Sequence, residues 1–163
     1  MESNAEDKLK SLGLILPKAP QAVANYVPFI RDGQTLYISG QLSLSPNQKV
    51  LRGKLGDTLS LEDGRRAAEL CVLNILAQIK RALNDLDQVA QVVKLGGYVN
   101  ATQDFIDHPA VINGASDLMV AIFGSETGQH VRTAVGCSNL PLGAAVEVEA
   151  IVRVKKVGAA PDN

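Results

Sequence analysis

Residues 146–154 alternate between small apolar side chains and larger or charged ones, and this pattern constrains the fold more than any other part of the chain. Successive side chains of a strand point to opposite faces, so this strand has a valine face and a face that carries Glu147 and Glu149. The valine face must be covered by other apolar side chains, whereas the carboxylate face must meet water, a ligand or another chain. A sheet covered on one side only satisfies both requirements.

Two long helical patterns can supply that cover. From Ser60 to about residue 85, apolar side chains recur at i, i+3 and i+4 spacing after a capping signature made by Ser60 and Asp63. The second pattern starts at the cap residue Asp107, has a proline in its first turn and reaches a glycine stop at Gly124. We therefore expect two helices on the valine face.

Strand signals fill most of the remaining chain. Asp32-Gly33 predicts the tight turn of a hairpin, and the run from Val89 to Val99 predicts a buried strand in which Gly96-Gly97 permit a close backbone approach. Residues 130–152 predict two strands joined by a Pro-Gly loop, of which the second is the alternating strand described above. The expected fold is α+β, a single mixed β-sheet with two α-helices packed on one face.

The expected domain organisation is simple. Residues 1–21 form an N-terminal helical extension, with a short helix capped by Ser3 or Asn4 and ended by Gly13. Residues 22–155 form the single domain, and residues 156–163 form a flexible tail.

Composition excludes several classes of function. Sixteen basic residues against seventeen acidic ones leave a net charge of -1, which gives no basic footprint for nucleic acid. The two cysteines match no metal-ligand spacing. Neither His108 nor His130 has a serine, cysteine or aspartate close in sequence that suggests a triad, which leaves open a triad that assembles only in space. No stretch approaches the roughly 18 apolar residues of a membrane span, and the N-terminus is charged. We expect a cytoplasmic protein that binds no metal.

Arg132 stands inside a predicted strand among small and apolar neighbours. A guanidinium is always charged, so burying it without a partner is costly. The sequence leaves three alternatives open. The side chain reaches solvent, or it pairs with Glu147 or Glu149 across adjacent strands, or it clamps a carboxylate or phosphate ligand, which its planar fork suits. Ala134 shares the arginine's face and leaves room beside it.

Other positions are candidates for a binding site, each with a structural alternative. Tyr26 presents its phenol to a cleft or packs at an interface, and Ser39-Gly40 either let backbone amides approach a ligand or simply end a strand. Asn113 bonds a ligand or a loop, or is solvated. The two glutamates of the last strand share one face, where like charges repel, so one is a candidate general base; the alternative is that both are solvated.

Taken together, these positions resemble the Rid family, also called YjgF-like proteins, a family of imine and enamine deaminases. The resemblance covers about residues 22–155 and rests on five features in the family's order and approximate spacing, namely YVPFI at 26–30, ISGQL at 38–42, Asn113, Arg132, and LPLGAAVEVEAIV at 140–152. The chain departs from the short family members in carrying Ala134 where they often have cysteine. It also has an added N-terminal segment and extra residues before Asn113.

The resemblance implies a chorismate-mutase-like fold, assembled as a homotrimer with clefts between subunits. It also implies that Arg132 holds the substrate carboxylate and that Glu147 positions a water molecule. The remaining site residues implied by the resemblance are Tyr26, Ser39, Gly40, Asn113 and the backbone at Ala134.

The activity implied is hydrolytic deamination of 2-imino or enamine acids, such as 2-aminoacrylate, to 2-keto acids and ammonia, with no metal or organic cofactor. Two alternatives remain open. One is a trimer that binds a small carboxylate without catalysis, and the other is an endoribonuclease, which the charge balance disfavours. The expected partners are therefore a small 2-imino or keto acid and further copies of this chain.

Overall fold

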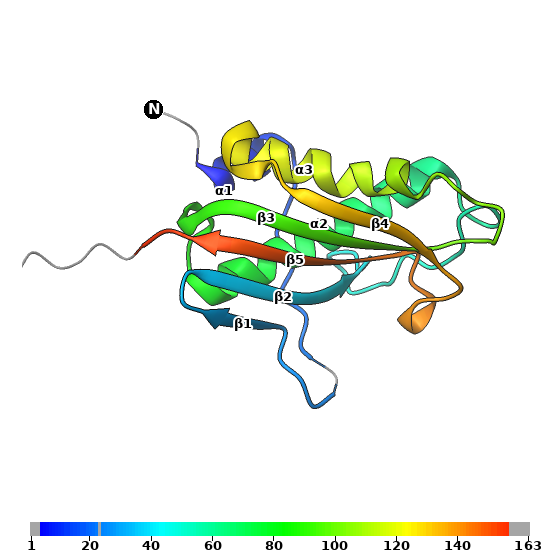
Figure 1. Ribbon diagram of the computed structural model, residues 1–163, viewed down its shortest axis with the longest axis horizontal. Helices are drawn as coiled ribbons and strands as arrows, with labels where there is room; N and C mark the ends of the chain where they lie inside the picture. The colour runs from blue at the N-terminus through cyan, green and yellow to red at the C-terminus, as the bar shows by residue number, and fades with distance from the viewer. Residues whose placement is uncertain (1–3, 23, 157–163) are drawn as a thin grey trace, which may run out of the picture.

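The computed structural model describes residues 4–22 and 24–156, which form one five-stranded sheet with helices on one side (Figure 1). The strands are β1 (Phe29–Asp32), β2 (Thr35–Leu42), β3 (Val89–Asn100), β4 (Val131–Cys137) and β5 (Val146–Val154), in the order β1-β2-β5-β3-β4. All neighbours are antiparallel except β3 and β4, which are parallel. The predicted α+β fold with a single mixed sheet is confirmed.

Two helices, α2 (Leu61–Leu83) and α3 (His108–Gly128), cover the valine face of the sheet, as the alternation of β5 predicts (Figure 1). Val146, Val148 and Val152 are fully buried beneath them. The same layer holds Leu36 and Ile38 of β2. In the described part of the chain, no helix lies against the opposite face of β5, which carries Glu147 and Glu149, and both glutamates are half-buried (Figure 1).

Two glycines determine how closely α3 approaches its neighbours. A Cβ atom at Gly97 would lie 2.6 Å from the side chain of Ile112, and one at Gly114 would lie 2.3 Å from the backbone oxygen of Arg65. Non-bonded carbon contacts need about 3.5 Å, so α3 can lie this close to β3 and α2 only because both positions lack a side chain. This packing places α3 next to the edge strand β4.

The helix ends follow the sequence signals with one difference. Ser60 and Asp63 form the predicted capping box of α2. Asp107 is the N-cap residue of α3, but its side chain makes no capping hydrogen bond. Gly124 was expected to end α3; instead it kinks the helix with a φ of 77°, and one more turn continues to Gly128. Glycine adopts this left-handed conformation without strain, so the chain can change direction and then resume the helix.

The hairpin between β1 and β2 also refines the prediction. Asp32 pairs with Thr35, so the two loop residues are Gly33 and Gln34. Of the Asp32-Gly33 pair, only Gly33 has a positive φ, 58°. A positive angle at the first loop position alone is the pattern of a type II′ turn, which matches the twist of the two strands.

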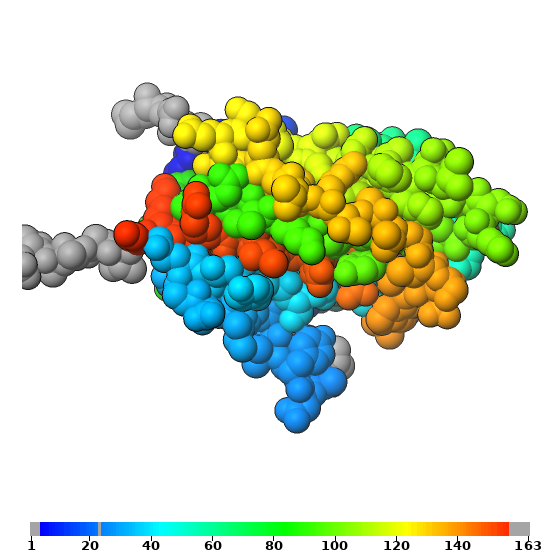
Figure 2. All heavy atoms as spheres, viewed as in Figure 1, coloured from blue at the N-terminus to red at the C-terminus, as the bar shows by residue number. Residues whose placement is uncertain are grey.

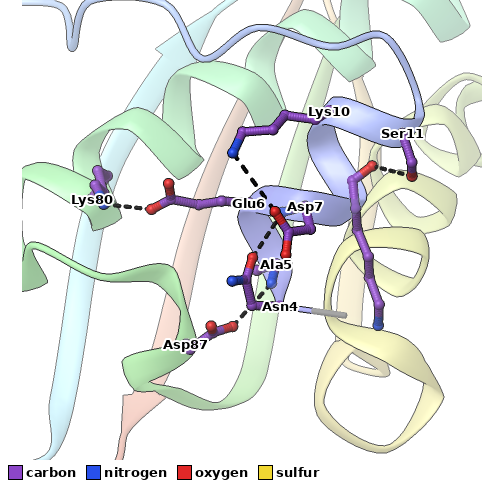
Figure 3. Close-up of polar contacts among 9 residues, drawn as sticks. Asn4, Ala5, Glu6, Asp7, Lys10, Ser11, Lys80 and Asp87 are labelled. Carbon is purple, nitrogen blue, oxygen red and sulfur yellow. Dashed lines mark hydrogen bonds and ion pairs between the residues drawn. The ribbon is translucent and has the colours of Figure 1, made fainter. Parts of the chain in front are cut away.

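The helix α1 (Ala5–Ser11) packs against α3 and the short 3₁₀ turn η1 (Leu86–Gln88) (Figure 3). Ala5 and Leu9 are buried in the core, and the backbone nitrogen of Ala5 donates to Oδ1 of Asp87 at 3.0 Å. Glu6 pairs with Lys80 of α2. The N-terminal segment is therefore held to the domain by both apolar and polar contacts.

Of the two predicted caps of α1, Asn4 makes the capping bond, because its side chain accepts from the backbone nitrogen of Asp7. Ser3, the alternative cap, lies outside the described residues, as do residues 157–163 of the predicted tail. Within the described ranges, none of the helices has the length and apolar character needed to cross a membrane.

Candidate functional site

Glu147 lies on the sheet face that the helices leave open, and a glycine makes room for its carboxylate. A methyl group at Gly40 would lie 2.0 Å from Oε1 of Glu147. The carboxylate therefore occupies the space that the Cβ atom of any other residue type at position 40 would need. Burial raises the pKa of Glu147, and the charge of Glu149 raises it further. Glu147 is thus a carboxyl group that can accept and return a proton nearer to neutral pH than an exposed glutamate can.

Glu149 lies beside it, over Gly96 of β3, where a Cβ atom would be 2.6 Å from its Oε1. The hydroxyl of Tyr98 donates a hydrogen bond to the same oxygen at 3.2 Å. Burial, and then the charge of Glu149, raise the pKa of Tyr98, so the phenol stays protonated and remains a donor. This bond fixes the position of Glu149 and gives its negative charge a hydrogen-bond donor.

Tyr26 and Ser39 lie next to this pair of carboxylates. A cavity of about 650 Å³ on the open face is lined by Tyr26, Ser39, Gly96 and Glu149, together with apolar side chains of β1 and β2. The Ser39 hydroxyl donates to the backbone oxygen of Val27 at 2.8 Å and so ties the segment before β1 to the end of β2.

Tyr26 also borders a second, smaller hollow of about 110 Å³, which Gly40 and Leu142 help to line. In Figure 2 the blue segment before β1 and the orange segment between β4 and β5 project from the body on either side of an indentation. Tyr26, Ser39, Gly40 and Glu147 therefore form one group of neighbours at the β2 and β5 side of the open face.

Arg132 belongs to a different surface. Its Nη1 donates to Oγ of Ser116 at 3.0 Å and its Nη2 to the backbone oxygen of Pro109 at 3.3 Å, and both acceptors belong to α3. The side chain therefore lies on the helix side of the sheet, along the edge formed by β4. Pairing of Arg132 with Glu147 or Glu149 was wrong, because β3 separates β4 from β5 and the glutamates face the other way. The alternation of side chains along a strand shows which residues share a face of the sheet, but it does not show which strands are neighbours.

Asn113 and Ala134 lie with Arg132. Pro109, Asn113 and Ser116 are spaced at i, i+4 and i+7 along α3, so Asn113 lies on the helix face whose two neighbours bind the guanidinium. Ala134 follows Arg132 by two residues on β4 and points to the same side of the sheet. Both are half-buried.

The predicted site residues thus fall into two separate groups within one chain. We call Arg132, Asn113 and Ala134 the arginine half-site, and Tyr26, Ser39, Gly40 and Glu147 the glutamate half-site. The sheet lies between the two half-sites. Among residues 4–22 and 24–156, no ion pair involves Arg132, and no three histidine, cysteine or acidic side chains lie close enough to hold a metal ion.

Three polar residues of the site were not predicted. Tyr98 stands two residues after Gly96 in β3, and this period-two spacing on the open face could have indicated its contact with the glutamates. Ser116 is one helical turn from Asn113, and this spacing could have indicated that both side chains lie on one face of the helix. The contact of His130 with Ser116 could not be read from the sequence, because it joins residues 14 positions apart across a kink.

The comparisons agree with this architecture. Residues 6–153 match the family model described as "YjgF/chorismate_mutase-like, putative endoribonuclease". The chain is 44% identical over 146 residues to Protein TCP17 of Trypanosoma cruzi, covering 90% of this chain and 91% of that protein. It belongs to the YjgF/chorismate-mutase-like family, as the sequence motifs indicated.

Two further similar proteins differ in what is known of their activity. The crystal structure of Atu1372 from Agrobacterium tumefaciens, a protein described as of unknown function, has a TM-score of 0.85 at 44% identity, covering 93% of this chain and 94% of that chain. A 2-iminobutanoate/2-iminopropanoate deaminase of Dermatophagoides farinae is 27% identical over 140 residues, covering 85% of this chain and 93% of that protein.

Proposed function

We propose that this chain hydrolyses 2-imino acids and their enamine tautomers to 2-keto acids and ammonia, in a site that two copies of the chain complete. The observation that carries the proposal is the division of the site into two half-sites. A guanidinium with free donors lies on one side of the sheet, and a glutamate with a raised pKa lies on the other. The deaminase name of a relative supplies the reaction class.

Arg132 would hold the substrate carboxylate. A guanidinium has five N–H donors, and its own chain occupies two of them, so three remain for a ligand. A bidentate pair with a carboxylate needs two. Asn113 lies on the face of α3 that binds the Arg132 guanidinium, and it can add a polar contact to the same ligand.

The edge strand β4 would hold the imine group next to the arginine. Among the described residues, only β3 pairs with β4, so the backbone groups on the outer side of β4 are available to a ligand. A backbone group at Ala134 can then bond the imine nitrogen while Arg132 holds the carboxylate two residues away.

Glu147 of a second copy would handle the protons. When the imine is protonated, the Glu147 carboxylate takes a proton from water as the water oxygen attacks C2, which gives a neutral carbinolamine. The carboxylic acid then returns that proton to the nitrogen. As the C–N bond breaks, the carboxylate takes the proton of the hydroxyl group, so that ammonia and a 2-keto acid leave. A carboxyl group with a raised pKa suits this exchange, because it accepts and donates with similar ease.

Assembly of copies is supported by the open sheet face. Tyr37, Val131 and Val135 are 45%, 67% and 41% exposed. The alternation of β2 and β4 places Tyr37, Val131 and Val135 on the side away from the helices. Exposed apolar side chains gathered on one sheet face are typical of a surface that meets another chain, and we propose the homotrimer expected from the family resemblance.

The test uses 2-iminobutanoate generated in situ from the amino acid. Wild type should accelerate its loss over the uncatalysed hydrolysis, and Arg132→Ala should lower kcat/KM by roughly ten- to a hundredfold, because a charge-assisted hydrogen bond contributes about 1.5–3 kcal/mol. Binding of 2-oxobutanoate without any acceleration would instead support the carboxylate-binding alternative. Full activity in Arg132→Ala would refute the proposed site.

A further inference from the structure

The guanidinium of Arg132 is the first member of a chain of hydrogen bonds that ends in the backbone. Oγ of Ser116, which accepts from Nη1 of Arg132 at 3.0 Å, lies 3.0 Å from Nε2 of His130. Nδ1 of His130 lies 2.7 Å from the backbone oxygen of Gly128. The three side chains come from α3, from the segment after it and from β4.

The donor and the acceptor of each hydrogen bond in this series follow from its last bond, between His130 and the backbone oxygen of Gly128. A carbonyl oxygen only accepts, so Nδ1 of His130 carries a proton, and when the ring is neutral Nε2 is an acceptor. The Ser116 hydroxyl therefore donates to His130, and its lone pairs point to Arg132. With a neutral imidazole, one arrangement satisfies all three residues, and in it Ser116 is oriented as an acceptor for the guanidinium.

The backbone beneath His130 is held in place by two contacts. A Cβ atom at Gly128 would lie 2.7 Å from the backbone oxygen of Met119, so the last turn of α3 is packed against the helix before the kink. The side-chain amide of Gln91, in β3, donates to the backbone oxygens of Gln129 at 2.6 Å and Thr127 at 3.2 Å. The carbonyl that fixes the His130 ring is thus part of a rigid turn.

Fixing the guanidinium has a direct consequence for binding. A free arginine side chain has considerable rotamer entropy, which ligand binding would remove. The bonds to Ser116 and Pro109 impose that order before the ligand arrives and leave three N–H donors on a fork of fixed orientation.

We propose that Ser116 and His130 are positioning residues that orient Arg132 for a ligand carboxylate. The identity of that ligand, a 2-imino or 2-keto acid, rests on the proposed function above. A serine bonded to a histidine also resembles a nucleophile with its base. However, Ser116 stands inside α3, where backbone N–H groups are used by the helix, and its lone pairs face a guanidinium. This arrangement supplies no oxyanion hole of backbone donors.

The experiment measures both 2-oxobutanoate affinity by calorimetry and the kinetics of 2-iminobutanoate hydrolysis. Ser116→Ala should weaken 2-oxobutanoate binding and raise KM by roughly fivefold to tenfold, the effect of one misplaced hydrogen-bonding group, with kcat within about twofold. Ser116→Thr, which keeps the hydroxyl, should recover most of the lost affinity. His130→Leu should resemble Ser116→Ala, because without its acceptor the Ser116 hydroxyl turns freely.

The matched control is Ser125→Ala, an exposed serine of the same helix, which should bind 2-oxobutanoate as wild type does. If Arg132→Ala loses binding but Ser116→Ala does not, the positioning role is refuted and the proposed function stands. If Arg132→Ala itself binds and turns over normally, both are refuted. Covalent labelling of Ser116 by a fluorophosphonate, absent in His130→Leu, would overturn the positioning role in favour of a nucleophile.

Discussion

Replacing Gly40 by alanine should displace the Glu147 carboxylate while leaving the fold intact. The new methyl group would lie 2.0 Å from Oε1 and 2.8 Å from Cδ of Glu147. Because non-bonded contacts need about 3.5 Å, the carboxylate oxygen must move by more than about 1 Å. A displacement of that size at a reacting group lowers turnover by about a hundredfold.

The effect of Gly40→Ala on stability should be small, so a loss of activity can be distinguished from a loss of folded protein. Gly40 does not have a positive φ, so alanine fits the backbone and gains about 0.4–1 kcal/mol from a less flexible unfolded chain. The crowded atoms belong to the far end of a side chain that can turn away. The melting temperature should stay within a few degrees of wild type while kcat/KM for 2-iminobutanoate falls.

Gly96→Ala is the matched control, because it crowds the other carboxylate. Its methyl group would lie 2.6 Å from Oε1 of Glu149 and leave Glu147 in place. We expect a fall in kcat/KM of less than about tenfold, since Glu149 acts only through its charge and its bond to Tyr98. Wild-type activity in Gly40→Ala, or a larger loss in Gly96→Ala, would refute the assignment of the proton transfers to Glu147.

Three further outcomes are expected. Glu149→Gln removes a charge that raises the pKa of Glu147, so the acid limb of the pH profile of kcat/KM should move to lower pH; an unchanged limb would contradict this coupling. Because the folded chain holds the Glu147 proton more tightly than the unfolded chain, this glutamate lowers stability as pH rises above the usual glutamate pKa. Glu147→Gln should therefore melt above wild type at pH 8, with the difference vanishing in acid. Leu9→Ala, which truncates a side chain that is 3% exposed, should lower the free energy of unfolding by about 2–4 kcal/mol in urea; a loss below 1 kcal/mol would mean that α1 is not part of the core.

The sequence predicted those parts of the fold that depend on local periodicity. The alternation of β5 and the helical spacing after Ser60 each report which side chains are buried, so the one-sided sheet and its helix layer followed. Strand order did not follow, because nothing in the alternation of β4 or β5 tells which strand lies between them. For this reason the sequence allowed a pair between Arg132 and Glu147 that the inserted strand β3 prevents.

The candidate site was predictable to a similar extent. The resemblance supplied the candidate residues of both half-sites, but it could not show how Ser116 and His130 meet Arg132. That contact depends on Gly124, which the sequence marks as a helix end and which the structure uses as a kink before a final turn. A glycine predicts that a change of direction is possible, and tertiary packing decides whether the helix resumes.

Complementation between two inactive variants tests most directly whether the site is shared between copies. Arg132→Ala and Glu147→Gln, carrying different affinity tags, are expressed together, and mixed oligomers are isolated by successive purification on both tags. In a trimer that contains both variants, one of the three interfaces joins an intact arginine half-site of one copy to an intact glutamate half-site of the next, so about a third of the wild-type activity should return. Activity in the mixed oligomers no higher than in either variant alone would contradict the account.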